Sequence, residues 1–255
     1  MKTFIFVGLV GAIAMAGTTA KAAEIKVLTA GAYKAVLVAL VPEFEKSTGH
    51  KVVLDNDTAG ALQKRISGGE AFDLAVITPR VVGDLAKDGK VATGSQTNLA
   101  RVGIGVVVKE GAPVPNIATV DAFKQAVLEA KSVAYIDPAS GGSSGIYLDQ
   151  LFQKMGIADQ VKPKAKLKQG GYVAELIVNG EAELGIHQIS EIVPVKGAHL
   201  VGPLPAEIQN YTTYAGGISA AAKEPEAAKA LLSLLTSETA VAVLKSRGME
   251  AAPGS

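Results

Sequence analysis

The chain has 255 residues, of which 48% are hydrophobic and 19% charged, with 25 Lys and Arg against 24 Asp and Glu and no Cys. This composition excludes disulfides, cysteine-based metal sites and thiol nucleophiles, and its apolar content is too high for a disordered chain. The balanced charge argues against nucleic-acid binding, and the length suits one large domain or two small lobes.

The first 22 residues are predicted to be an export signal. One Lys precedes an apolar run over residues 4–17, and Ala20-Lys21-Ala22 matches an A-x-A cleavage site. The run is short for a transmembrane helix, although an uncleaved anchor is the alternative. We therefore expect cleavage after Ala22 and a periplasmic protein. No later run approaches membrane length, so the product is expected to be soluble.

The segment after this signal alternates strands and helices. The pattern predicts strands at residues 25–29, 51–54 and 73–77 and helices at 33–48, 60–67 and 81–87. Pro42 lies inside the first helix and predicts a kink or break there. The β-α-β-α-β order indicates a parallel sheet, in which ligands bind at the carboxyl ends of strands. Here those ends are residues 29–32, 57–60 and 78–80.

A second α/β unit begins near residue 101. Strands are predicted at 101–109, 133–136, 183–188 and 212–219, and helices at 119–130, 146–155, 173–179 and within 225–246. Two lobes joined by two crossing segments would form a cleft, and one continuous doubly wound sheet is the alternative. We expect lobe I to comprise residues 23–101 and 209–255, and lobe II residues 102–208.

The turn before the 146–155 helix is a candidate anion site. Its small residues offer backbone N–H groups, hydroxyls and a helix N-terminus, although simple capping would use the same residues. The proposed ligand contacts are Ser140, Gly141, Ser143 and Ser144. The turn also contains G-x-S-x-G, but six residues separate its serine from the strand, so a hydrolase nucleophile elbow does not fit.

The strand ends of the first lobe supply further candidate contacts. They are Thr29, Gly31, Ala32, Thr58, Ala59 and Gly60. Helix capping by Asp57 or Thr58 is the structural alternative, and both roles are compatible. Arg80, after the third strand, is placed either to clamp a carboxylate or to lie solvated on the surface.

Several segments together resemble the molybdate-binding type of periplasmic solute receptor. They are V-L-T-A-G-A, F-E-K-S-T-G-H-K-V, T-A-G-A-L-Q-K-R-I-S-G-G-E-A-F-D-L-A-V-I, A-R-V-G-I-G-V-V-V, I-D-P-A-S-G and N-G-E-A-E-L-G-I. The resemblance covers the mature chain. It implies a two-lobed type 2 periplasmic-binding-protein fold of the α/β class, with mainly parallel sheets flanked by helices. It also implies closure around a small anion for delivery to an ATP-driven (ABC-type) importer.

The resemblance breaks down at the expected ligand contacts. Oxyanion-binding members have serine at the position of Ala32 and tyrosine at the position of Gln188. They have a second serine before the G-A-L helix, where this chain has Thr58-Ala59. An unpaired ligand oxygen in a dry cleft costs about 1–3 kcal/mol. An organic carboxylate or polycarboxylate is therefore preferred over molybdate. The altered pocket is also compatible with a resemblance to aconitate isomerases, exported enzymes on the receptor fold.

The two functions require different residues. A receptor needs hydrogen-bond donors for the anion. Gln188 and Tyr172, which follows Gly170-Gly171, are further candidate ligand contacts. An isomerase also needs a base and an acid for proton transfer between two carbons, and the candidates are His187, Glu191 and Tyr147. The three scattered histidines do not indicate a metal site. We expect no cofactor, no nucleic-acid partner and a monomer.

Overall fold

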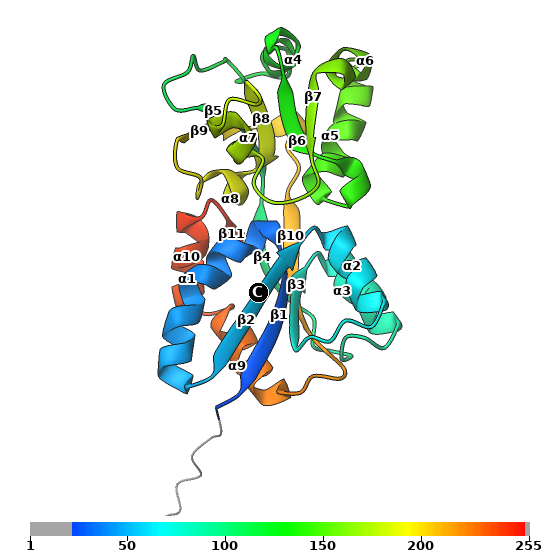
Figure 1. The fold of residues 1–255 in the computed structure, drawn as a ribbon, viewed down its shortest axis with the longest axis vertical. Coiled ribbons are helices and arrows are strands. Elements are labelled where there is room, and N and C mark those ends of the chain that lie inside the picture. Colours follow the sequence, from blue (N-terminus) through cyan, green and yellow to red (C-terminus); the bar gives the residue numbers. More distant parts are fainter. Residues whose placement is uncertain (1–21, 253–255) are drawn as a thin grey trace, which may run out of the picture.

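The computed structural model describes residues 22–252 and contains two sheets, each flanked by helices (Figure 1). All of the predicted signal except Ala22 lies outside the described residues. The two sheets have separate hydrophobic cores, so the structure has two lobes and not one continuous sheet. Within the described residues, no single helix is long and apolar enough to cross a membrane, and one bent pair of helices passes that test jointly.

Lobe I is built on a six-stranded sheet. Its strands, in spatial order, are β11 (Glu250–Ala251), β4 (Thr97–Val102), β10 (Thr212–Ile218), β3 (Leu74–Ile77), β1 (Glu24–Ala30) and β2 (Lys51–Asp57). Its helices are α1 (Gly31–Thr48), α2 (Ala59–Ser67), α3 (Pro79–Lys87), α9 (Pro225–Leu234) and α10 (Glu238–Ser246). The bent pair is α9 and α10, whose apolar faces are buried against this sheet.

Lobe II is built on a five-stranded sheet. Its strands, in spatial order, are β7 (Ala165–Lys168), β6 (Val133–Ile136), β8 (Leu184–Gln188), β5 (Ile104–Lys109) and β9 (Ala198–Pro203). Its helices are α4 (Val120–Glu129), α5 (Ser143–Lys154), α6 (Ala158–Val161), α7 (Ala174–Val178) and α8 (Ile189–Ile192), with short 3₁₀ segments η1 (Pro138–Ser140), η2 (Lys162–Lys164) and η3 (Ala206–Ile208).

The structure corrects three predictions. The single strand predicted at residues 101–109 is two strands, β4 and β5, which belong to different lobes and separate at Gly103. Helix α1 continues through Pro42, so of the predicted kink or break the break is not found. The sheets are mixed, because β10 runs antiparallel to β3 and β4, and β5 runs antiparallel to β8 and β9. The chain returns to lobe I in the opposite direction, which produces the antiparallel pairs of β10.

The two segments that cross between the lobes are fastened to each other. The first passes through Gly103, and the second contains Gln209. The Gln209 side-chain amide donates to the carbonyl of Ile104 at 2.9 Å and accepts from its N–H at 2.8 Å. A Cβ at position 103 would lie 3.1 Å from this amide, so glycine permits the close approach. The crossing point is therefore fixed by a pair of reciprocal hydrogen bonds.

Candidate functional site

A narrow cleft, with a cavity volume of about 30 Å³, lies between the lobes and receives residues from both. Lobe I supplies Ala30, Gly31, Ala32, Asn56, Asp57, Thr58, Ala59 and Tyr214. Lobe II supplies Ile136, Gly142, Ser143, Ser144, Gly170, Gly171, His187, Gln188 and Glu191. Strands β1, β2, β6 and β8 all end at this cleft, as expected for ligand sites in α/β sheets.

Three helices of eight or more residues begin at the cleft, and this arrangement favours an anion. They are α1, α2 and α5, and none has an acidic residue in its first turn. The caps of α1 and α5, Ala30 and Gly142, provide no side-chain hydrogen bond. First-turn N–H groups have no partner within their helix, and the helix dipole adds positive potential there. Local backbone donors therefore converge on one space.

A buried side-chain donor adds to this set. Tyr214 Oη donates to Gln188 Oε1 at 2.9 Å, which fixes the orientation of the amide. Gln188 Nε2 is then buried without a hydrogen-bond partner among the described residues. Leaving such a donor unpaired costs about 1–3 kcal/mol. A ligand oxygen in the cleft would satisfy it.

A buried histidine–glutamate pair lies on the lobe II side of the cleft. His187 Nε2 is 3.2 Å from Glu191 Oε2, and the side chains are 2% and 7% exposed. Burial raises the pKa of Glu191 and lowers the pKa of His187, so both groups are uncharged at neutral pH. The protonated carboxyl then donates to the imidazole. His187 Nδ1 has no partner among the described residues.

Glu191 also reaches across the cleft to lobe I. Its Oε1 lies so close to Gly31, the first residue of α1, that any Cβ at that position would overlap it. Burial raises the pKa of the half-buried Tyr172. The carboxyl of Glu191 therefore lies at the N-terminus of α1, where an anionic ligand is expected.

Most residues predicted to bind or react are brought together in this cleft. Those that line it are Gly31, Ala32, Thr58, Ala59, Ser143, Ser144, His187, Gln188 and Glu191. The remaining predicted residues lie beside or outside the lining: Thr29, Gly60, Arg80, Ser140, Gly141, Tyr147 and Tyr172.

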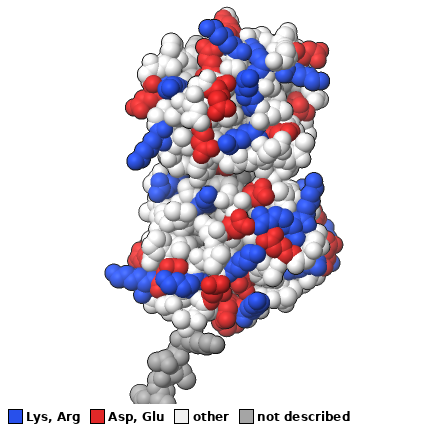
Figure 2. Space-filling model, viewed as in Figure 1, with Lys and Arg blue, Asp and Glu red and all other residues white. Residues whose placement is uncertain are grey.

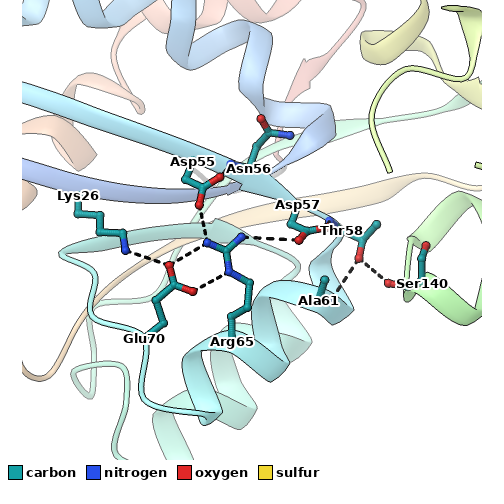
Figure 3. Close-up of polar contacts among 9 residues, drawn as sticks. All are labelled: Lys26, Asp55, Asn56, Asp57, Thr58, Ala61, Arg65, Glu70 and Ser140. Carbon is teal, nitrogen blue, oxygen red and sulfur yellow. Dashed lines mark hydrogen bonds and ion pairs between the residues drawn. The ribbon is translucent and has the colours of Figure 1, made fainter. Parts of the chain in front are cut away.

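Four of the predicted residues join the two lobes directly. Thr58 Oγ1 donates to the carbonyl of Ser140 at 2.5 Å, and Gly60 N–H donates to the carbonyl of Gly141 at 3.2 Å (Figure 3 shows the first of these). Thr58 Oγ1 also caps α2 by accepting from the N–H of Ala61. These groups hold the lobes together across the cleft and are engaged with protein partners.

The other predicted residues make local contacts. Thr29 is buried within β1, and its hydroxyl donates to the carbonyl of Ala30. Arg80 is exposed and pairs with Asp84 on the same helix at 3.1 Å. Tyr147 donates to the carbonyl of Ile208 at 2.7 Å. Arg80 and Tyr147 therefore lie away from the cleft lining, with their polar ends occupied.

The sequence analysis missed Tyr214 and Asn56 as members of the lining. Tyr214 lies on β10 just after the second crossing segment, a position that becomes informative only once the crossing is known. Among the described residues there is no group of three or more His, Cys, Asp or Glu suited to hold a metal ion.

Comparisons with known proteins agree with this architecture. Residues 25–250 match the model of a bacterial extracellular solute-binding protein family. The chain is 34% identical to an aconitate isomerase from Pseudomonas sp over 253 residues, with 95% of each chain covered. It is 26% identical to the molybdate-binding protein ModA of Azotobacter vinelandii over 238 residues, with 90% of each covered.

Solved structures show the same fold. A periplasmic molybdate-binding protein from Azotobacter vinelandii superposes with a TM-score of 0.76 at 21% identity, covering 88% of this chain and 98% of that one. The sulfate-binding protein SubI of Mycobacterium tuberculosis superposes with a TM-score of 0.72 at 16% identity, covering 91% and 88%. The expected two-lobed type 2 fold is thereby confirmed.

Proposed function

Because the chain belongs to the bacterial extracellular solute-binding protein family, we propose that its cleft binds a small polycarboxylate and isomerises it, as an aconitate isomerase does. The observation that carries this proposal is the buried pair of His187 and Glu191, which faces the anion donors across the cleft. A receptor needs hydrogen-bond donors alone. A buried acid held at a raised pKa is typical of proton transfer.

The proposed reaction moves one proton between two carbons of aconitate. In its ionised form the Glu191 carboxylate takes a proton from the methylene carbon, and the C–H electron pair becomes part of a new double bond. The Glu191 carboxyl then returns the same proton to the former vinyl carbon, and the electron pair of the old double bond forms the new C–H bond. Proton and electron counts are unchanged, so no oxidant or reductant is consumed. His187 holds the carboxyl in place by hydrogen bonding.

The remaining lining residues supply binding and charge stabilisation. The N-termini of α1 and α5 and the free Nε2 of Gln188 are neutral donors for the substrate carboxylates, whereas the Gly60 and Ala61 N–H groups of α2 already have protein partners. Negative charge moves onto a carboxylate as the proton leaves carbon, and preorganised donors stabilise that charge. Closure of the lobes removes water from the cleft, which strengthens these interactions.

A receptor without catalysis is the second candidate. The 26% identity to ModA favours it, and so does the use of neutral donors throughout the described lining. In that case the protein is a periplasmic monomer that delivers a small anion to an ABC-type importer. In either case we propose that residues 1–22 direct export and that the ligand is an organic carboxylate rather than molybdate.

The test is direct incubation of the purified mature chain with trans-aconitate, with cis-aconitate followed by proton NMR. We expect interconversion in both directions to the same equilibrium ratio. In deuterated water, return of the same proton predicts that the product of a single turnover carries little deuterium, and full labelling of that product would contradict this step. Tight binding of trans-aconitate by calorimetry with no interconversion would instead establish the receptor.

A further inference from the structure

Asp57 places a negative group in a cleft that is built for an anion. It ends β2 and lines the cleft, and its side chain is 36% exposed. The described lining contains no Lys or Arg that could balance it. A like charge beside a bound carboxylate weakens binding. The structure must therefore compensate for Asp57 from outside the lining.

Arg65 on α2 is the cation that reaches Asp57 from behind the cleft. Its Nη1 lies 3.6 Å from Asp57 Oδ2. Asp57 Oδ1 accepts from the backbone N–H of Thr58 at 2.8 Å. Both carboxylate oxygens are thus engaged, as Figure 3 shows for the contact with Arg65, although Oδ1 still faces the cleft, 3.8 Å from where a Cβ on Gly170 of lobe II would lie. Asp57 is held in one orientation.

The guanidinium is itself fixed by two other carboxylates. Arg65 Nε lies 2.6 Å from Glu70 Oε2, and Nη2 bonds both Glu70 and Asp55. Lys26 adds a bond to Glu70 at 2.9 Å. Hydrogen bonds from Arg65 lower the pKa of Asp55 and, with Lys26, that of Glu70, so these acids are charged near neutral pH. Figure 3 shows the cluster beneath the end of β2.

The cluster has more negative than positive groups. It joins the three carboxylates of Asp55, Asp57 and Glu70 to two cations, Arg65 and Lys26. Asp55 and Asp57 are two residues apart on β2, so their side chains project to the same face, where α2 places Arg65. Charges of both signs are mixed over the face shown in Figure 2.

We propose that Arg65 is a positioning residue for anion binding: it holds the Asp57 carboxylate at the cleft in one orientation and balances its charge. The inference rests on the proposed function only in taking the ligand to be an anion. Without Arg65, the Asp57 carboxylate at the cleft loses its balancing cation and one of its two contacts, and the excess of negative charge beside the ligand rises. Arg65 does not touch the ligand, so its effect passes through Asp57.

The test compares four proteins: the wild type, Arg65→Met, Asp57→Asn and the double variant. Each is titrated with trans-aconitate and, separately, with molybdate by calorimetry at low salt. We expect Arg65→Met to weaken binding about fivefold to tenfold, in line with one unbalanced charge near a surface site. In the Asp57→Asn background the same substitution is expected to change affinity less than about twofold, since the group it acts on is neutral.

Two controls separate charge from folding. Arg80→Met removes the same charge from lobe I at an exposed site outside the cleft and is expected to leave affinity unchanged. Arg65→Lys keeps the charge but loses hydrogen bonds, so its melting temperature is expected to fall while affinity stays near wild type. A structural role for Arg65 would instead make affinity follow the melting temperature in all variants.

The outcomes distinguish this inference from the proposed function. An equal loss from Arg65→Met with and without the Asp57→Asn substitution refutes the inference, as does no loss at all. A wild type that binds molybdate and not trans-aconitate refutes the assigned substrate, while the ratios among the variants still test Arg65 with molybdate as the probe.

Discussion

Replacing Glu191 with Gln should slow isomerisation by orders of magnitude while preserving the fold. The amide matches the carboxyl in shape and can donate to His187 Nε2, but it cannot take a proton from carbon. General acid–base catalysis contributes about 10²–10⁴-fold, and we expect a loss of kcat in that range. Calorimetric affinity for trans-aconitate should change much less, because the anion donors are untouched. Glu207→Gln is the matched control, an exposed residue of the same lobe with the same change of charge.

The wild-type rate should depend on pH through the same carboxyl. Burial raises the pKa of Glu191 to about 8, so the ionised base is a minority at neutral pH. Below that pKa its fraction changes about tenfold per pH unit, and kcat at pH 6 should be roughly a hundredth of the plateau above pH 9. A profile that is flat between pH 6 and 8 would refute Glu191 as the base.

Stability should show the opposite trend with pH. Glu191 stays protonated in the folded protein up to about pH 8 but ionises near pH 4.3 when unfolded, so its stabilising contribution is lost as pH rises. Burial lowers the pKa of His187 to about 3, so above pH 6.5 this group is neutral in both states and adds no slope. Because the folded protein binds one more proton than the unfolded chain, the free energy of unfolding falls by about 2 kcal/mol over about 1.5 pH units, which lowers Tm by about 4–8 °C.

Calorimetric melting of the wild type and the Glu191→Gln variant tests this reasoning. Between pH 6.5 and 8 the free energy of unfolding of the wild type should fall by about 2 kcal/mol more than that of the variant. If both proteins show the same slope, Glu191 is already ionised in the folded state, and the assignment of an uncharged pair is wrong.

Two further substitutions test the geometry. Gly60→Ala places a Cβ 2.8 Å from the Cα of Gly141 in the other lobe, so it should obstruct closure of the lobes at a cost of about 1–3 kcal/mol. We expect weaker ligand affinity and a larger radius of gyration in X-ray scattering. The control is Gly83→Ala, whose Cβ meets nothing nearer than 3.8 Å and which should change neither quantity. Gly31→Ala overlaps the Glu191 carboxyl and should lower kcat by about 10²-fold with a smaller change in KM; unaltered kcat would show that Glu191 needs no contact with α1.

The sequence predicted elements well where local patterns decide them. The strand at residues 133–136 is found as predicted, and the first two helices differ from prediction only by one or two residues at their starts. The run at 101–109 was misread because residues on both sides of Gly103 are buried and apolar, although they face different cores. Hydrophobicity alone does not report which core a residue joins.

The site was predictable in outline and not in its contacts. Strand ends and helix starts correctly located the cleft, since that rule follows from sheet topology. The partners of Thr58 and Gly60 lie about 80 residues further along the chain, on the other lobe, and no local pattern indicates such contacts. The pairing of His187 with Glu191 required knowledge that α8 turns immediately after β8 and brings residue 191 back beside residue 187.

The reciprocal hydrogen bonds of Gln209 and Ile104 constrain how the lobes can move. They fasten the two crossing segments to each other at one point, so the segments are expected to move together there. A pair of linked segments bends about one common axis and resists shear. We therefore expect the lobes to separate by rotation about an axis near residues 103 and 209, so that displacement grows with distance from that axis. On this basis we expect the cleft to open most widely at the edge farthest from Gln209, and we expect the proposed ligand to enter there.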